Sequence, residues 1–497
     1  MCHDQLMRLA SSLGLGAALV VAGCLAAGIQ QPSAVGAAEV GYVALPSPAR
    51  VLDTRSDGAT VDGQFQRGGI RPLGSTLALT VAGRAGVPSD ATAVVLNVTV
   101  TEATGSGYVT VYPCGATQPT ASNLNYVSGK NIPNLVIAKV GTAGQACLFN
   151  TAPTQLIVDV AGYFPGTDAL APLDAPARLL DTRPDGITID GIGAAGGIRG
   201  AGTVQTLQIA GRAGISAGVS SVVLNVTVDQ PDGSGYITVY PCDAARPTAS
   251  NVNYVLNQTI PNAAIAKVAA DGTVCFFTSR ATHLIVDAAG YFADASVLVP
   301  LPAPARLLDS RSGGATIDGL FQATGFRPSG GTIQLTVAGR AGIPATASAV
   351  VLNVTVDQAQ TEGYITVYPT GVARPNASNL NYVIGQTVPN AVIARLGSGG
   401  TICLYSSGAT HLIVDVAGYL IGPAPAAPGS SCPADPLPPA PQPPGPTPTT
   451  QPPGGGLDPR YPTCTAAKAA GYGPYVFGVD PEYAWYEDRD HDGIVCE

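Results

Sequence analysis

The chain has 497 residues, of which 24 are Lys or Arg and 33 are Asp or Glu, so its net charge is −9. Charged residues make up only 11% of the chain, which disfavours a general nucleic-acid binder because such proteins need clustered cations. Gly and Pro number 61 and 43, and this favours short strands and many turns over helical bundles. At roughly 100 to 200 residues per domain, the length predicts three or four domains.

The first segment, residues 1–38, is predicted to be a signal peptide, because the almost uncharged run Leu9–Ile29 leads into small residues. Two processing routes are open. One is cleavage after Ala37 or Ala38. In the other, Cys24 ends a Val-Ala-Gly-Cys sequence that resembles a bacterial lipobox and is acylated. Both routes export the protein. No later stretch reaches the ~18 apolar residues of a membrane helix, so no transmembrane segment is expected in the mature chain.

One module is repeated three times in the central part of the chain. The sequence Asp-Thr-Arg at Asp53 recurs at Asp181 and, as Asp-Ser-Arg, at Asp309, and each step is 128 residues. Other landmarks keep the same offset: Arg84, Arg212 and Arg340; Asn97, Asn225 and Asn353; Asn123, Asn251 and Asn379; Asn134, Asn262 and Asn390; and Asp159, Asp287 and Asp415. A fixed period of this kind indicates repeated structural units. We predict modules at 43–165, 170–294 and 298–422.

Each module is expected to be mainly β, with seven or eight short strands. Apolar and polar residues alternate in segments such as 93–101, 108–112 and 156–160, which is typical of strands. About 122 residues suffice for a core, so we predict three tandem antiparallel β-sandwich modules, either immunoglobulin-like or jelly-roll-like. A β-propeller is disfavoured because its blades are much shorter.

The cysteines that remain after export match this division and predict disulfides, which persist outside the cytoplasm. Copies one and two each have two cysteines 33 residues apart, whereas copy three has Thr370 in place of the first. The predicted pairs are Cys114–Cys147, Cys242–Cys275, Cys403–Cys432 and Cys464–Cys496. Each loop of this length is expected to add roughly 3 to 4 kcal/mol to stability in the chain-entropy model. Residues 423–459 are rich in Pro and are predicted to be an extended spacer.

The last ten residues contain the sharpest chemical motif. Asp488, Asp490 and Asp492 alternate and are followed by Gly493, as in a Ca²⁺ loop with oxygen donors at positions 1, 3 and 5 and a glycine at 6. The carbonyl of Ile494 would serve as position 7. The chain ends before the Glu that an EF-hand has at position 12, so Glu497 is expected to substitute for it.

Residues 461–497 resemble the Excalibur domain, an extracellular calcium-binding module with the hallmark Asp-x-Asp-x-Asp-Gly-x-x-Cys-Glu, which this chain has from Asp488 to Glu497. The resemblance implies that the motif aspartates and Glu497 hold Ca²⁺. For so small a domain, the metal and Cys464–Cys496 are expected to stabilise the fold together. The three repeats resemble tandem repeats of exported actinobacterial proteins, a group for which no activity is implied.

Nothing in the repeats predicts catalysis. Asp159 lies between two valines of a strand and would suit a carboxylate pair that cleaves sugars, but a structural ion pair with a repeated arginine is the preferred interpretation. His283 and His411 have Gln155 as their counterpart in copy one, so we expect no shared metal or catalytic role for them. We expect that the protein is not an enzyme.

Two functions remain open. The first is an exported, cell-surface or cell-wall-associated Ca²⁺-binding protein that has cell-wall polymers as partners. The second is a multivalent lectin-like protein with three equal glycan sites, which would gain avidity from tandem display. For the second, the Ser-Asn-Leu-Asn-Tyr segment at 122–126 and its copies offer amides and an aromatic ring for sugars. The alternative for these amides is that they satisfy backbone groups in turns.

Overall fold

The computed structural model describes residues 41–166, 169–422, 429, 431–433, 459–477, 479–487 and 494–496. The predicted signal peptide, Cys24 and most of the predicted spacer lie outside these residues. The chain divides into two compact units, Met1–Pro433 and Ala434–Glu497. In the described part of the chain, no helix has the length and hydropathy needed to cross a membrane.

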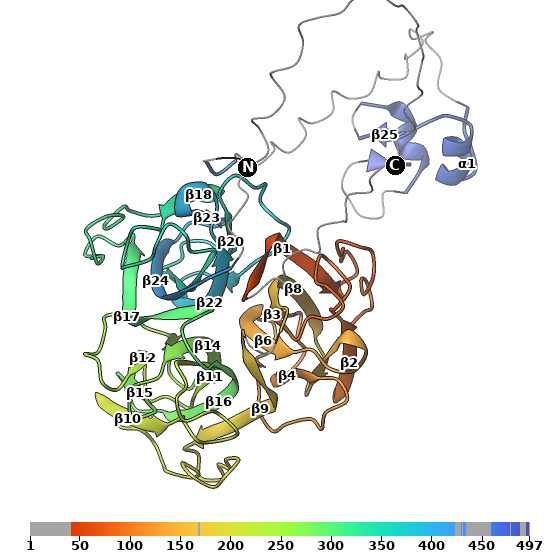
Figure 1. Ribbon diagram of the computed structural model, residues 1–497. Helices are drawn as coiled ribbons and strands as arrows, with labels where there is room; N and C mark the ends of the chain where they lie inside the picture. The colour runs from red at the N-terminus through yellow and green to blue at the C-terminus, as the bar shows by residue number, and fades with distance from the viewer. Residues whose placement is uncertain are drawn as a thin grey trace, which may run out of the picture. The chain divides into compact units, whose positions relative to one another are not determined.

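The first unit contains three modules of eight strands each (Figure 1). In module 1 the strands are β1 (Val43–Asp53), β2 (Ser75–Thr80), β3 (Ala93–Thr101), β4 (Gly107–Pro113), β5 (Leu124–Tyr126), β6 (Ile132–Lys139), β7 (Gln145–Asn150) and β8 (Gln155–Phe164). In module 2 they are β9 (Ala171–Asp181), β10 (Thr203–Gln208), β11 (Ser221–Asp229), β12 (Gly235–Pro241), β13 (Val252–Tyr254), β14 (Ile260–Lys267), β15 (Thr273–Thr278) and β16 (His283–Phe292). In module 3 they are β17 (Leu298–Asp309), β18 (Gly331–Thr336), β19 (Ala349–Asp357), β20 (Gly363–Pro369), β21 (Leu380–Tyr382), β22 (Val388–Arg395), β23 (Thr401–Ser406) and β24 (His411–Leu420). Short 3₁₀ turns lie at η1 (Thr142–Gly144) and η2 (Ser398–Gly400).

Each module is a sandwich of two four-stranded antiparallel sheets. In module 1 the inner sheet has the order β1-β8-β3-β6 and the outer sheet the order β2-β7-β4-β5. Consecutive strands therefore pass between the two sheets, except for the β4–β5 hairpin within the outer sheet, as in an eight-stranded jelly roll. The fold is mainly β, as predicted, and of the two predicted sandwiches it is the jelly roll.

The central strand β3 shows why the modules do not stand alone. Leu96, Val98 and Val100 face the core between the two sheets of module 1. Ala93 and Val95 point to the opposite face, where they join a cluster that also contains residues of modules 2 and 3. All nine residues of β3 are consequently buried. An antiparallel sheet with one wet face would expose its second face, whereas here the second face is buried and carries Ala93 and Val95 beside the polar Asn97 and Thr99.

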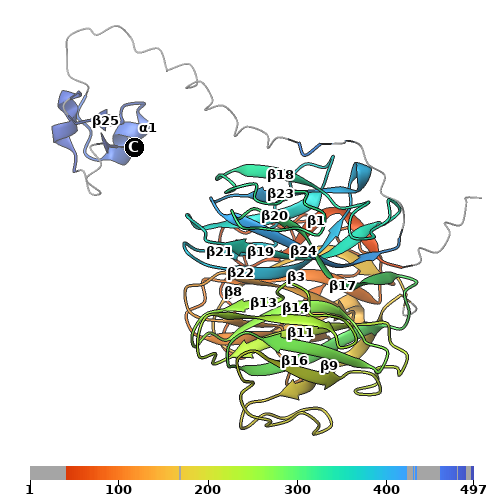
Figure 2. The same cartoon turned by 90° about the vertical axis from the view of Figure 1, so that its left-hand side faces the viewer.

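The three inner sheets pack around a pseudo-threefold axis, and the modules form a ring (Figures 1 and 2). The edge strands β6, β14 and β22 contact one another in pairs. Our expectation of three tandem sandwiches is therefore correct for each module but misses their arrangement. The ring forms because the second apolar face of each inner sheet needs a partner to exclude water.

The ring closes where its first and last described residues meet. Within module 3 the backbone amide of Ile421 donates to the carbonyl of Val297 at 2.7 Å, and Gly41 of module 1 lies beside both residues. Gly41, with φ of +101°, leaves no room for a side chain, because a Cβ there would lie 2.7 Å from the Ile421 carbonyl oxygen. A Cβ on Gly422 would likewise lie 2.4 Å from the carbonyl oxygen of Tyr42. Glycine thus allows the two backbones to cross closely.

The structure contains the four disulfides expected from the sequence. Three are in the first unit, with Cα–Cα distances of 5.0, 5.0 and 5.7 Å. Cys403–Cys432 attaches the segment after module 3 to β23, and the Ser431 carbonyl accepts a hydrogen bond from the Gly371 amide at 3.0 Å.

The second unit is small. It contains α1 (Cys464–Ala469), β25 (Tyr475–Val476), the 3₁₀ turn η3 (Pro481–Trp485) and β26 (Ile494–Val495). Thr463 begins α1 as its N-cap, because its side-chain oxygen accepts from the Ala466 amide at 3.2 Å. Strands β25 and β26 pair antiparallel, and Cys464–Cys496 joins the helix to the C-terminal strand.

Candidate functional site

The buried carboxylate Asp159 is held by an arginine, as the preferred interpretation of the sequence expected. Arg50 Nε donates to Asp159 Oδ1 at 2.8 Å and its Nη2 donates to Oδ2 at 3.3 Å. Asp159 is only 2% exposed, and this burial raises its pKa even though Arg50 acts in the opposite direction. The arginine was not among those that the sequence singled out. The sequence could have identified Arg50, since Arg178 and Arg306 occupy the same position in the other two copies and bind the equivalent aspartates.

The remaining repeated ion pairs fix the loop after the first strand of each module. Arg55 donates from Nε and Nη2 to the two oxygens of Asp53 at 2.9 and 2.7 Å. Arg84 binds Asp62 through Nε and Nη2, both at 2.8 Å, and also donates to the carbonyls of Thr80 and Val51. These hydrogen bonds occupy both arginines with intramodular partners. They are structural supports for the module.

The histidines also have structural contacts. His283 Nδ1 lies 3.2 Å from Thr182 Oγ1 and 3.0 Å from the Thr182 carbonyl oxygen. His411 lies under the ring of Phe326, with 3.8 Å between ring centroids, and burial lowers its pKa.

Three seams, where one module meets the next around the ring, share one hydrogen-bond pattern. An asparagine of each module donates to an asparagine of the next: Asn134 to Asn225 at 2.8 Å, Asn262 to Asn353 at 2.9 Å, and Asn390 to Asn97 at 3.0 Å. We call these seams 1/2, 2/3 and 3/1 after the modules that they join. Asn97, which begins a glycosylation sequon, is buried in seam 3/1, where its Nδ2 donates to the Ser378 carbonyl at 2.6 Å.

The Ser-Asn-Leu-Asn-Tyr segments lie at these seams, and most of their polar groups satisfy the backbone. Asn123 Oδ1 accepts from the Val111 amide at 2.7 Å, and the Ser122 carbonyl accepts from Asn225 Nδ2 across seam 1/2. Tyr126 Oη donates to the Ala152 carbonyl at 2.8 Å. These contacts agree with the second interpretation of the segments, in which their polar side chains satisfy backbone groups. The second asparagine of the segment differs, because Asn381, its copy in module 3, lines two cavities.

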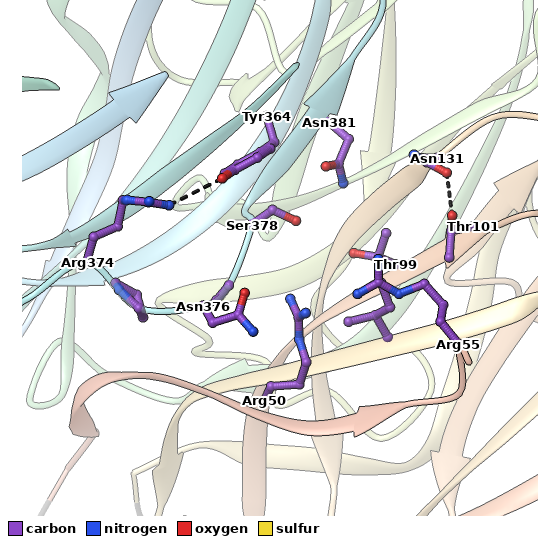
Figure 3. Close-up of a pocket in the computed structure, with 13 residues that line it drawn as sticks. Arg50, Arg55, Thr99, Thr101, Asn131, Tyr364, Arg374, Asn376, Ser378 and Asn381 are labelled. Carbon is purple, nitrogen blue, oxygen red and sulfur yellow. Dashed lines mark hydrogen bonds between the residues drawn. The ribbon is translucent and has the colours of Figure 1, made fainter. Parts of the chain in front are cut away.

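Those two cavities adjoin each other along seam 3/1. The first, of about 270 Å³, lies between strands of module 1 and the β20–β21 connection of module 3 (Figure 3). The second, of about 530 Å³, is lined by the β5–β6 loop of module 1, by module 3 and by Gln258 of module 2. Asn131, Tyr364 and Asn381 line both. Together the two cavities form one polar groove, which we call the seam 3/1 groove.

In the second unit, the described residues fix the two ends of the predicted calcium motif. Glu487 precedes the motif, and Ile494 and Val495 pair with Val476 and Tyr475. Tyr475 and Tyr486 stack with 5.8 Å between ring centroids. The predicted ligands Asp488, Asp490, Asp492 and Glu497 lie outside the described residues, so their assignment stays a prediction. Three aspartates, a glutamate and a backbone carbonyl are the donor set that Ca²⁺ prefers.

Elsewhere in the described ranges, no group of three or more His, Cys, Asp or Glu side chains is placed to hold a metal ion.

Three jelly rolls followed by a small disulfide-linked unit define a modular protein whose disulfides are typical of an oxidising, extracellular compartment. Residues 461–497 match the family described as the Excalibur calcium-binding domain. The chain thus carries a domain of an extracellular calcium-binding family at its C-terminus, as its sequence motif predicts.

The other comparisons add little. No curated protein matches the chain. One similar solved structure is described as "The Triple Jelly Roll Fold and Turret Assembly in an Archaeal Virus"; it is 8% identical, with 77% of this chain and 90% of that chain covered and a TM-score of 0.18. Another, from Sulfolobus Turreted Icosahedral Virus, is 8% identical, with 72% and 86% covered and a TM-score of 0.18. This TM-score is too low to relate the folds.

Proposed function

We propose that this protein is exported to the cell surface or cell wall, where it binds Ca²⁺ through its C-terminal unit and has a structural or interaction role. The observation that carries the proposal is the match of residues 461–497 to the Excalibur calcium-binding domain. The ring of jelly rolls would present this unit across the Pro-rich segment, and bound Ca²⁺ would link it to anionic wall polymers. The ligands would be Asp488, Asp490, Asp492, Glu497 and the carbonyl of Ile494.

The repeats support a role without catalysis. A hydrolase of the two-carboxylate type needs two carboxyl groups that both reach the bond to be cleaved, one of them able to donate a proton. Asp159 and Asp53 are both 2% exposed or less and both bind Arg50. Neither is positioned to meet a substrate, and the same holds for their counterparts in the other two modules.

Calcium titration calorimetry on the full chain tests the proposal. We expect saturable binding at the C-terminal unit that Asp490→Ala removes. Asp480→Asn is the matched control, because Asp480 accepts from the Val476 amide outside the motif at 2.9 Å and an amide oxygen keeps that bond. Protection of the unit from proteolysis by Ca²⁺ should follow the same pattern. No binding up to several millimolar Ca²⁺, or equal binding by the Asp490→Ala variant, would refute the calcium role.

The second candidate is carbohydrate binding. One observation favours it: beside charged residues, the seam 3/1 groove is lined by amides, hydroxyls and two tyrosines, Tyr364 and Tyr382, and these are groups that recognise sugars. Three equal sites are not what the geometry supports, since the position of Arg374 in this lining is Gln118 in module 1 and Arg246 in module 2.

A further inference from the structure

The outer sheet of module 1 ends in a strand that no other described strand covers. Strand β2 pairs with β7 on one side and is the last strand of the order β2-β7-β4-β5. The long connection between β1 and β2 turns back on β1, where the Val61 amide donates to the Arg50 carbonyl at 3.0 Å. This connection covers the edge of the inner sheet and leaves the edge of the outer sheet open at the rim of the ring (Figure 1).

The register of β2 shows which of its backbone groups face the open edge. Along an antiparallel strand, residues that bond to one neighbour alternate with residues that bond away from it. The Val81 amide, directly after β2, donates to the Gly144 carbonyl on the β7 side. Counting back by two, every odd-numbered residue of β2 bonds to β7. The amides and carbonyls of Thr76 and Ala78 therefore point outward, and no hydrogen bond within the described part of the chain reaches them.

The strand lacks the features that usually keep a sheet edge from pairing with another chain, which are charges, prolines and bulges. The six residues of β2 include neither a charge nor a proline, and their register with β7 has no shift. The side chains of Thr76 and Ala78 are small and exposed, so a second strand can approach the backbone. Arg84 occupies only the last carbonyl of the strand, that of Thr80, at 2.7 Å.

The equivalent edges of modules 2 and 3 are less open. In module 2 the residue in place of Ala78 is Thr206, and its carbonyl already accepts from Gln205 Nε2 at 2.6 Å. In module 3 it is Gln334, which lies opposite Cys403 in the ladder. The disulfide of Cys403 attaches the segment after the ring at this place. Edge pairing is therefore expected at one strand of each chain.

Apolar side chains flank the open edge of module 1. Leu73, just before the strand, is 71% exposed, and Ile70 is 49% exposed. Modules 2 and 3 have Ala201 and Ser329 in place of Leu73. Within the strand, Leu77 is half-buried against the core of the module. Exposed apolar residues beside an unpaired edge indicate a surface that another strand covers.

We propose that β2 pairs antiparallel with β2 of a second copy of this chain, so that two rings share one continuous outer sheet across a twofold axis. The strand is complementary to itself in this register. Leu77 lies opposite Leu77 of the second copy, and Thr76 of each copy lies opposite Ala78 of the other. The outward amides and carbonyls of both strands then form four backbone hydrogen bonds, and no charged side chain of β2 meets another across the axis.

A second copy is the occupant because the same strand supplies both the backbone and the apolar contacts. In the antiparallel pair, Leu73 of each copy reaches the far end of the other copy's strand and leaves water, and the two Leu77 side chains pack together at the axis. A twofold contact uses the same patch on both subunits and is closed at two copies. With one open edge per chain, the assembly stops at a dimer and does not involve the calcium-binding unit.

Sedimentation velocity on the full oxidised chain in EDTA tests this contact in the absence of calcium. We expect a dimer at micromolar concentrations of the chain, with the same sedimentation after Ca²⁺ is added. A chain that remains monomeric up to submillimolar concentration, a main species larger than a dimer, or a dimer that forms only with Ca²⁺ would overturn the proposal. Failure of the chain to bind calcium would refute the proposed function and leave this contact unaffected.

Matched variants locate the contact. Ala78→Lys places a charge on the edge and should weaken dimerisation about tenfold or more, while Thr206→Lys at the equivalent position of module 2 should leave it unchanged. Leu77→Cys should give a disulfide-linked dimer on mild oxidation, because residues directly opposite each other in such a pair lie within disulfide distance. Gln205→Cys is the control in module 2 and should give no crosslink. Equal effects of the two lysine variants, or no crosslink from Leu77→Cys, would refute the assignment.

Discussion

Asn134 of module 1 and Asn225 of module 2 form a side-chain hydrogen bond of 2.8 Å across a fully buried seam. Asn134 Nδ2 also donates to the Asn123 carbonyl within its own module, and its Oδ1 accepts from the Ala263 amide of module 2 at 3.0 Å. One amide thus satisfies groups on both sides of the seam. The arrangement repeats at the other two seams and fixes the register of the ring.

Replacing this asparagine should destabilise the ring. Asn134→Ala leaves the Asn225 side chain, the Asn123 carbonyl and the Ala263 amide without their partner, and unsatisfied buried groups cost about 1 to 3 kcal/mol each, less where they relax. We expect a loss of about 2 to 4 kcal/mol in the free energy of unfolding, measured with guanidinium. Gln118→Ala, at an exposed position, is the control and should change it by less than about 0.5 kcal/mol. Equal stability of the two variants would show that the asparagine hydrogen bonds between modules do not contribute to the free energy of unfolding.

A single module should not be a stable monomer. Residues 41–166 alone would expose the face formed by Ala93, Val95, Leu135, Ile137 and Phe164, which the ring buries. An apolar patch of this kind drives association, and the seam pattern is self-complementary around a threefold axis. We expect this fragment to form a trimer, measured by light scattering after size exclusion. A well-folded monomer at micromolar concentration would contradict the importance of the shared cluster.

The buried ion pair of module 2 should be costly to break. Asp287 is 2% exposed and accepts two hydrogen bonds from Arg178, at 2.8 and 3.3 Å. Asp287→Leu would leave part of the guanidinium buried without a counter-charge, for which about 3 to 5 kcal/mol is typical. The exposed pair of Lys139 and Asp174 provides the control, since Asp174→Asn should cost less than about 1 kcal/mol. Thermal denaturation should give a clearly lower melting temperature for Asp287→Leu than for Asp174→Asn. Similar melting temperatures would contradict the view that the buried ion pair is the more costly one to break.

Stability should fall in acid below about pH 4. Hydrogen bonds from arginine lower the pKa of Asp62, Asp190 and Asp318 in the folded chain, so each binds a proton less readily than the unfolded side chain, whose pKa is about 3.9. Their contribution is complete above that value and is lost as the pH falls through the folded pKa values.

The triple variant Asp62→Asn, Asp190→Asn, Asp318→Asn should therefore show a weaker dependence of unfolding free energy on pH between 2 and 5 than the parent. Urea unfolding across this range gives the comparison. A parent chain whose stability does not change between pH 5 and 2, or a variant with a steeper dependence, would contradict the assigned direction.

The sequence was sufficient for the parts of the fold that repeat. The fixed 128-residue offset located the modules, alternation located strands such as β3, and equal spacing paired Cys114 with Cys147. The sequence did not predict the ring, although Ala93 and Val95 indicate that the second face of β3 is partly apolar. A strand pattern records that a face is apolar but does not identify what covers it, because the covering residues come from other modules.

The seam 3/1 groove was missed for a different reason. Searching for residues common to all copies selects those that build the module, such as Asp159 and Arg84. The groove is lined in part by positions where the copies differ, such as Thr101, which is Asp229 and Asp357 in the other copies. The residues that line it come from modules 1 and 3, and their proximity becomes visible only when the ring is closed.

The crossing of Tyr42 and Gly422 also has a mechanical consequence. Because the ring begins and ends at one place, a pull applied at residue 41 and at residue 422 acts across that junction alone. The force enters module 1 at Gly41 and leaves module 3 after β24, so module 2 and its two seams carry little load until the junction opens. A ring built this way would keep the seams of module 2 intact while residues 41 and 422 are under tension.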